Sequence, residues 1–159
     1  SWSPLYAKPL GLSLPIYPAK RYSVTMPVRD ATRAFQVSLS DDEYKIVFSR
    51  LGDKLRIAGT AELNGYDRDL NRVRCEALVR RTEELFPGAG DPERAQFWTG
   101  LRPATPSNVP IVGRSKLPKL YLNTGHGTLG WTHACGSGKS IARIVRGLKP
   151  EVQFPFVGL

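Results

Sequence analysis

Apolar and polar residues alternate in short runs over residues 14–63, a pattern typical of β-strands with one buried face. The runs are LPIYPAKRYSVTMPV, AFQVSLSD and YKIVFSRLGDKLRIAGTAEL. In the second run Phe35, Val37 and Leu39 alternate with their neighbours, so that one of these two sets faces inward. The third run divides at residues 51–53, a glycine-containing turn that predicts a hairpin. Because the turns are short, we expect an extended first third with antiparallel strand pairing.

A helical period replaces this alternation in the middle of the chain. The apolar positions recur at about helical spacing and are Leu70, Val73, Ala77, Leu78 and Leu85. They predict one amphipathic helix, with Asp67 or Asp69 as its cap. The segment FPGAGDPE ends this helix, because its proline and glycines do not continue it.

The remainder alternates turns with short strands and closes with a second helix. KLYLNTG reads as a compact apolar strand, and the helix is predicted from Leu129 to Arg146, with Gly147 as its stop. The inner side of this helix is predicted to consist of Ala134, Ile141, Ala142 and Val145. The tail PEVQFPFVGL is expected to be extended. This order of elements predicts an α+β fold with a mostly antiparallel sheet.

Composition narrows the function classes only a little. The 159 residues suffice for one domain with its own core, and the net charge is +9. The basic residues are scattered, and in NRVRCEALVRRTEELFPG they alternate with glutamates as on a solvated helix face, so no nucleic-acid partner is expected. Cys75 and Cys135 have no metal-ligand spacing, so we expect reduced thiols and no metal site. No apolar run reaches the length of about 18 residues that a spanning helix needs, and SWSPLYAKPLG does not read as a secretory signal.

The letters GSGKS at residues 136–140 suggest a phosphate-binding loop, whose pattern is G-x-x-x-x-G-K-[ST]. The position five residues before Gly138 is His133 rather than glycine. The pattern therefore fails, and a nucleoside triphosphate site is not expected here.

The glycines around the start of the last helix need another explanation. They are Gly127, Gly130, Gly136 and Gly138. A glycine inside a helix costs about 0.5–1 kcal/mol relative to alanine. Either helix and strand pack very closely at this place, or a polar ligand approaches the unpaired N–H groups and the positive end of the helix.

Arg102 is the second candidate for chemistry. It precedes Pro103 in the segment FWTGLRPATPSNVPIVG, where proline restricts the backbone. A guanidinium held in this way suits bidentate binding of a carboxylate. An ordinary surface or capping arginine is the alternative that these residues leave open.

The segments GLRPATPSNVPIVG and LYLNTGHGTLGWTHACGSG together resemble the C-terminal signature of the FAD-dependent D-amino acid oxidase superfamily, in particular its bacterial D-amino acid dehydrogenase branch. The resemblance extends upstream through LRIAGTAELNGYD, DDEYKIVFSR and LPIYPAKRYSVTMPV to SWSPL. The family's N-terminal strand–GxGxxG–helix unit has no counterpart in this sequence. The resemblance therefore implies the C-terminal portion of a larger enzyme, inactive alone, with residues 1–11 as the tail of the FAD-binding half, 12–98 as an antiparallel substrate-binding domain and 99–159 as a segment returning to the FAD-binding half.

The resemblance also implies roles for individual residues. Arg102 would hold the carboxylate of a D-amino acid, and the FAD contacts would be Gly127, Leu129, Gly130, Trp131 and Thr132. Tyr17, Tyr22 and Tyr44 are either walls of the substrate pocket or half-buried strand residues. The implied reaction is oxidative deamination to a 2-oxo acid and ammonia by hydride transfer to the flavin, where the helix N-terminus stabilises the developing negative charge.

The implied electron acceptor is respiratory, which is compatible with a cytoplasmic protein or with peripheral association at the cytoplasmic face of the inner membrane. Two residues depart from the family pattern. Arg21 stands where glycine is usual beside the flavin and is expected to crowd it, and Asn108 stands in a turn that usually has glycine, which asparagine can replace. The alternative to a dehydrogenase portion is a binding module of the same family without catalysis.

Overall fold

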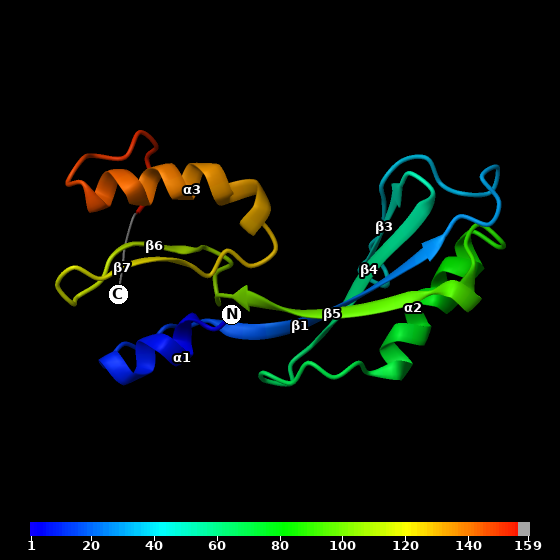
Figure 1. The fold of residues 1–159 in the computed structure, drawn as a ribbon, viewed down its shortest axis with the longest axis horizontal. Coiled ribbons are helices and arrows are strands. Elements are labelled where there is room, and N and C mark those ends of the chain that lie inside the picture. The colour runs from blue at the N-terminus through cyan, green and yellow to red at the C-terminus, as the bar shows by residue number, and fades with distance from the viewer. Residues whose placement is uncertain (156–159) are drawn as a thin grey trace. The chain divides into compact units, whose positions relative to one another are not determined.

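The computed structural model describes residues 1–155, which form two compact units (Figure 1). The sheet unit is Lys20–Leu101, and the terminal unit joins Ser1–Ala19 to the chain from Arg102 onward. In chain order the elements are α1 (Ser3–Ala7), η1 (Lys8–Leu10), β1 (Tyr17–Pro27), β2 (Leu39–Asp41), β3 (Ile46–Leu51), β4 (Lys54–Glu62), α2 (Arg72–Leu85), η2 (Pro92–Arg94), β5 (Gln96–Ala104), β6 (Ile111–Arg114), β7 (Tyr121–Thr124) and α3 (Gly130–Val145). The predicted α+β class is confirmed. The predicted boundaries after residues 11 and 98 concern a longer protein and stay a prediction.

The larger sheet has the strand order β2-β3-β4-β1-β5, and the pairs β2–β3, β3–β4 and β4–β1 are antiparallel. The predicted hairpin is confirmed, since Leu51 pairs with Lys54 across a turn in which Gly52 has φ +65°. One face of this sheet packs its apolar side chains together with those of α2. This core contains Tyr22, Val24, Met26, Ile46, Phe48, Leu55, Ile57, Cys75 and Leu78.

The middle helix begins later than predicted, and its buried face agrees only in part with the predicted one. Its cap is Asn71, whose side-chain oxygen accepts the Arg74 N–H at 3.4 Å, whereas Asp67 is bound to Lys20 instead. The predicted apolar stripe is wrong at Leu70, Val73 and Leu85, which are exposed, and is confirmed at Leu78, which is buried. The buried positions are Cys75, Leu78 and Thr82, the last of which donates its hydroxyl to a backbone carbonyl of the same helix.

Two segments expected to be extended are not strands. Only Leu39–Asp41 of the second run pairs in the sheet, and Val37 is 64% exposed. The Asp30 carboxylate accepts both the N–H and the hydroxyl of Thr32, which favours a turn before that run. The N-terminus instead begins with α1, where a proline in the first turn is compatible with a helix because it removes only an unpaired N–H.

The terminal unit places α3 along the antiparallel pair β6–β7 (Figure 1). Its apolar core contains Ala7, Leu12, Leu14, Ile16 and Leu122. The predicted bounds of the last helix are confirmed to within one residue at each end. Its predicted inner side is wrong at Ala134, Ala142 and Val145, which are exposed. Ile141 is partly buried, and the inward positions include Ser137 and Ser140. Residues 148–155 form neither helix nor strand, and the rest of the predicted extended tail, 156–159, lies outside the described residues.

A β-bulge interrupts the pairing of β1 with β4. Arg21 pairs with Ala61 and Tyr22 with Gly59, so Thr60 is the extra residue. Its φ of +53° lies in the left-handed region, which costs a non-glycine residue about 1–2 kcal/mol. The pairs on both sides of the bulge remain formed.

Lys20 is the most deeply buried charged residue of the sheet unit. Its side chain is 1% exposed, and its Nζ lies 2.7 Å from Asp67 Oδ2 and 3.5 Å from Glu62 Oε2. Glu62 also accepts hydrogen bonds from the Tyr22 hydroxyl and from the Asn71 amide. This Lys20 network joins β1, the end of β4, the following loop and the cap of α2.

The pKa shifts in this network show what it contributes to stability. Burial lowers the pKa of Lys20, but the hydrogen bonds to Asp67 and Tyr22 outweigh burial and raise it above the ordinary value. The hydrogen bond from Tyr22 lowers the pKa of Glu62, and the one from Lys20 lowers the pKa of Asp67. Because these carboxyl pKa values are lower in the folded state, their stabilisation is present above about pH 4 and is lost as the pH falls through the folded values.

We expect Lys20→Met to lower the free energy of unfolding by about 3 kcal/mol, because it leaves two partly buried carboxylates without their cation. Urea denaturation followed by circular dichroism measures the change. The control is Arg72→Gln, which removes a 91% exposed guanidinium from its pair with Glu76 on α2 and should leave stability almost unchanged. Equal stability of the two variants would contradict the central role of the Lys20 network.

Candidate functional site

The strand β7 leads through a glycine turn into α3. Gly125 has φ +77° and Gly127 has φ +52°, so both adopt the left-handed conformation. A Cβ on Gly125 would lie 2.7 Å from Thr105 Cγ2, whereas a Cβ on Gly127 would have no atom within 4 Å. Close packing therefore explains Gly125, while Gly127 borders open space.

The N-terminus of α3 is not capped by a side chain. Leu129 occupies the cap position without a capping hydrogen bond, and the first turn contains no acidic residue. By helix geometry the first N–H groups have no acceptor within the helix, and they concentrate partial positive charge there. Leu129 and Trp131 are 50% and 96% exposed. This end of α3 is thus suited to contact an electron-rich ligand edge.

A backbone hydrogen bond connects the glycine turn to the arginine segment. The N–H of Gly127 donates to the carbonyl of Pro103 at 3.0 Å, directly after Arg102. Arg102 itself lies near the end of β5 and is partly buried. The two sequence motifs that were singled out separately are therefore brought together within the terminal unit.

The turn between these motifs also forms as predicted. Asn108 has φ +58°, and its N–H donates to the Thr105 carbonyl at 3.1 Å. This confirms that asparagine replaces glycine in that turn.

The three tyrosines have different surroundings. Tyr17 is 42% exposed at the start of β1, and Tyr22 is buried with its hydroxyl on Glu62. The ring of Tyr44 stacks on Arg81, whose guanidinium carbon is 4.2 Å from the ring centroid. These contacts support structural roles for Tyr22 and Tyr44, and their place in a substrate pocket stays a prediction.

The structure adds a histidine pair that the sequence reasoning did not single out as a pair. The rings of His126 and His133 are 6.4 Å apart between centroids, one in the glycine turn and one in the first turns of α3. Burial, and then the neighbouring His133, lower the pKa of His126. The sequence could have indicated this pair, because the two histidines are only seven positions apart and lie on either side of the start of the predicted helix.

Other site classes receive no support within residues 1–155. No group of three or more potential metal-ligating side chains gathers there. Both cysteines are free thiols, Cys75 buried and Cys135 exposed. None of the described helices has the length and apolarity to cross a membrane.

Comparison with known proteins identifies the family. A family profile described as FAD dependent oxidoreductase (DAO) matches residues 1–144. The chain belongs to the FAD-dependent oxidoreductase family. D-amino acid dehydrogenase from Dechloromonas aromatica (strain RCB) is 57% identical over 157 residues, which are 99% of this chain and 38% of that protein. D-amino acid dehydrogenase from Paramagnetospirillum magneticum (strain ATCC 700264 / AMB-1) is 54% identical over 157 residues, 99% of this chain and 37% of that protein.

Solved structures of this oxidoreductase fold are similar over almost the whole chain. The structure of glycine oxidase from Geobacillus kaustophilus has a TM-score of 0.83 at 24% identity. The match covers 98% of this chain and 42% of the glycine oxidase chain. The structure of iminodiacetate oxidase from Chelativorans sp. BNC1 has a TM-score of 0.82 at 22% identity. The match covers 99% of this chain and 43% of the iminodiacetate oxidase chain. The chain thus spans about two fifths of the length of the relatives and solved structures that it matches.

Two glycine variants test how the turn is built. We expect Gly125→Ala to destabilise the protein by at least about 1 kcal/mol more than Gly127→Ala, because both variants strain a left-handed residue but only the first also collides with Thr105. Thermal unfolding of both variants measures the difference. Equal destabilisation would mean that close packing does not distinguish Gly125.

Proposed function

We propose that this chain is the substrate-binding portion of a FAD-dependent D-amino acid dehydrogenase. The proposal rests chiefly on the hydrogen bond from Gly127 to Pro103, which sets Arg102 beside the glycine turn of α3. The names of the two curated relatives, at 57% and 54% identity, support the D-amino acid as substrate class. The reaction proposed is oxidative deamination to a 2-oxo acid and ammonia.

Arg102 binds the substrate carboxylate in this proposal. A guanidinium offers two parallel N–H donors, which match the two oxygens of a carboxylate and fix the orientation of the amino acid. The following Pro103 restricts the backbone on one side, and its carbonyl is held by Gly127. The arginine is therefore oriented by the same turn that begins α3, so that substrate and cofactor contacts are coupled within one short segment.

The start of α3 fits one edge of FAD. When bound, FAD supplies a hydride acceptor, which no side chain can provide. The open space at Gly127 allows close approach to the backbone, and the uncapped N–H groups of Gly130, Trp131 and Thr132 favour negative charge at that edge. Leu129 completes the proposed contact set. The proposed electron acceptor is respiratory, which is compatible with action in the cytoplasm or at the cytoplasmic face of the inner membrane.

Arg21 favours a second candidate, a binding module that has kept the fold without the chemistry. It is partly buried on β1, and this burial lowers the pKa of its guanidinium. A bulky cation at a position where the family resemblance implies glycine would crowd the flavin. Binding of amino acids through Arg102 without turnover is what this candidate predicts.

A chimeric enzyme tests the proposed function directly. In it, this chain replaces the matching 157 residues of the Dechloromonas aromatica dehydrogenase. We expect the chimera to bind FAD and to oxidise D-alanine with a dye as electron acceptor. Arg102→Gln should lower kcat/KM about a hundredfold, mainly through KM, because it removes a charge-assisted contact with the carboxylate.

Two controls make this experiment decisive. Arg72→Gln removes an exposed arginine on α2 and should leave the kinetics of the chimera unchanged. Arg102→Lys keeps the charge but not the bidentate geometry, so its activity should fall between that of the chimera and that of Arg102→Gln. Binding of D-alanine with low flavin content and no turnover would support the binding module instead.

The crowding by Arg21 has its own test. We expect Arg21→Gly in the chimera to raise the fraction of protein that carries FAD, since glycine removes the side chain from the proposed flavin face. The absorbance ratio of bound flavin to protein measures this fraction. Equal or lower occupancy in Arg21→Gly would count against crowding.

A further inference from the structure

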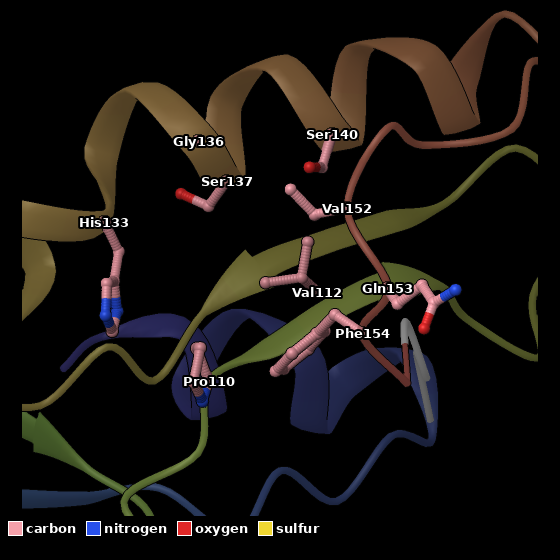
Figure 2. A pocket seen from close by; sticks show the side chains of 9 residues that line it. All are labelled: Pro110, Val112, His133, Gly136, Ser137, Ser140, Val152, Gln153 and Phe154. Carbon is pink, nitrogen blue, oxygen red and sulfur yellow. The ribbon is translucent and has the colours of Figure 1, made fainter.

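A cavity of about 270 Å³ lies between α3, β6 and the segment that follows α3, entirely within the terminal unit. Figure 2 shows the lining residues, which come from α3, from β6 with the segment before it, and from residues 152–154. The lining residues are Pro110, Val112, His133, Gly136, Ser137, Ser140, Val152, Gln153 and Phe154. Neither the reaction proposed above nor its cofactor contacts use this cavity.

The walls of the cavity differ in polarity. Ser137 and Ser140 lie on the α3 side of the space above Val112, and the ring of His133 points down from α3 on the side of Pro110 (Figure 2). Ser140 is only 5% exposed and lines the cavity. A hydroxyl that faces a cavity can bond to water or to the polar group of a ligand. The opposite walls are apolar, formed largely by Pro110, Val112 and Phe154.

Gly136 also lines the cavity. It lies inside α3, where glycine is unfavourable, and a Cβ at this position would have no atom within 4 Å. No packing contact of the described residues therefore requires a glycine there, and a larger side chain at this lining position can be introduced without a clash.

We propose that this cavity binds a neutral aromatic compound that carries one hydrogen-bonding group. The size is sufficient, since an apolar cavity of about 150 Å³ already binds benzene. The ring would lie against Val112 and Phe154, and its polar group would meet the Ser140 hydroxyl. Apolar walls with a few convergent polar groups are typical of small-molecule sites.

The charge of the surroundings selects a neutral ligand. The residues lining the cavity include no Asp, Glu, Lys or Arg. The nearest charges in sequence pair with each other, Lys139 with Glu151 at 2.6 Å and Arg143 with Glu151 at 3.4 Å. A charged ligand would lose its hydration without gaining a counter-ion.

The test uses the 159-residue chain and benzamide as the probe, followed by two-dimensional ¹H–¹⁵N NMR. We expect benzamide to shift the amide resonances of residues around the cavity. Benzoate has the same shape and a negative charge, and it should bind at least about tenfold more weakly. Ser140→Ala should also weaken the binding of benzamide, because it removes the hydrogen-bonding partner.

Two glycine variants provide the matched comparison. Gly136→Leu places a side chain at the cavity wall and should weaken benzamide binding at least about tenfold. Gly138→Leu changes the neighbouring glycine of the same helix, which does not line the cavity, and should leave binding unchanged. Should Gly136→Leu fail to fold, Gly136→Ala gives the same comparison with a smaller side chain.

The proposal is overturned if benzamide produces no shifts, if benzoate binds as tightly, or if the two leucine variants bind benzamide equally. Loss of binding in the chimeric enzyme would also overturn it, since polypeptide would then fill the cavity. These measurements need no turnover. Their outcome is therefore independent of whether the chimera oxidises D-alanine.

Discussion

The buried ammonium of Lys20 is the constraint on which the sheet unit depends. An unpaired charge in this position would be very costly, so the surrounding segments must supply its partners. Glu62 lies directly opposite Lys20 in the β1–β4 pairing, and Asp67 comes from the loop that follows β4. Asn71 donates to the same Glu62 while capping α2. One buried charge thus determines where the loop runs and where the helix begins.

The terminal unit depends on a backbone contact of a different kind. The N–H of Gly127 donates to the carbonyl of Pro103 and so joins the arginine segment to the turn before α3. The glycines before and within α3 have different surroundings. A Cβ on Gly125 would collide with Thr105, whereas Gly127 and Gly136 border open space, the latter in the lining of a cavity. Contact of a ligand with this glycine segment stays a prediction.

Local sequence signals predicted the structure correctly where residues only a few positions apart determine it. The hairpin at Gly52, the turn at Asn108 and the extent of α3 follow from turn chemistry and from helix period, which act within a few residues. They failed where a residue distant in the sequence binds a side chain that local signals assign to another role. Asp67 would cap a helix locally, but Lys20, 47 positions away, takes its carboxylate, and the cap moves to Asn71.

The sequence by itself indicated the family, the α+β class and a candidate site at Arg102 and the glycine turn. These could be predicted because sequence motifs and secondary-structure propensities depend on neighbouring residues. Only the tertiary structure decided which helix faces are buried, that Pro103 holds Gly127, and that Ser140 faces a cavity. Both helix faces were predicted only in part from apolar residues, since the polar residues Thr82 and Ser140 are buried, and Thr82 donates its hydroxyl to the Leu78 carbonyl. Burial depends on what packs from elsewhere in the chain, and no local pattern contains that information.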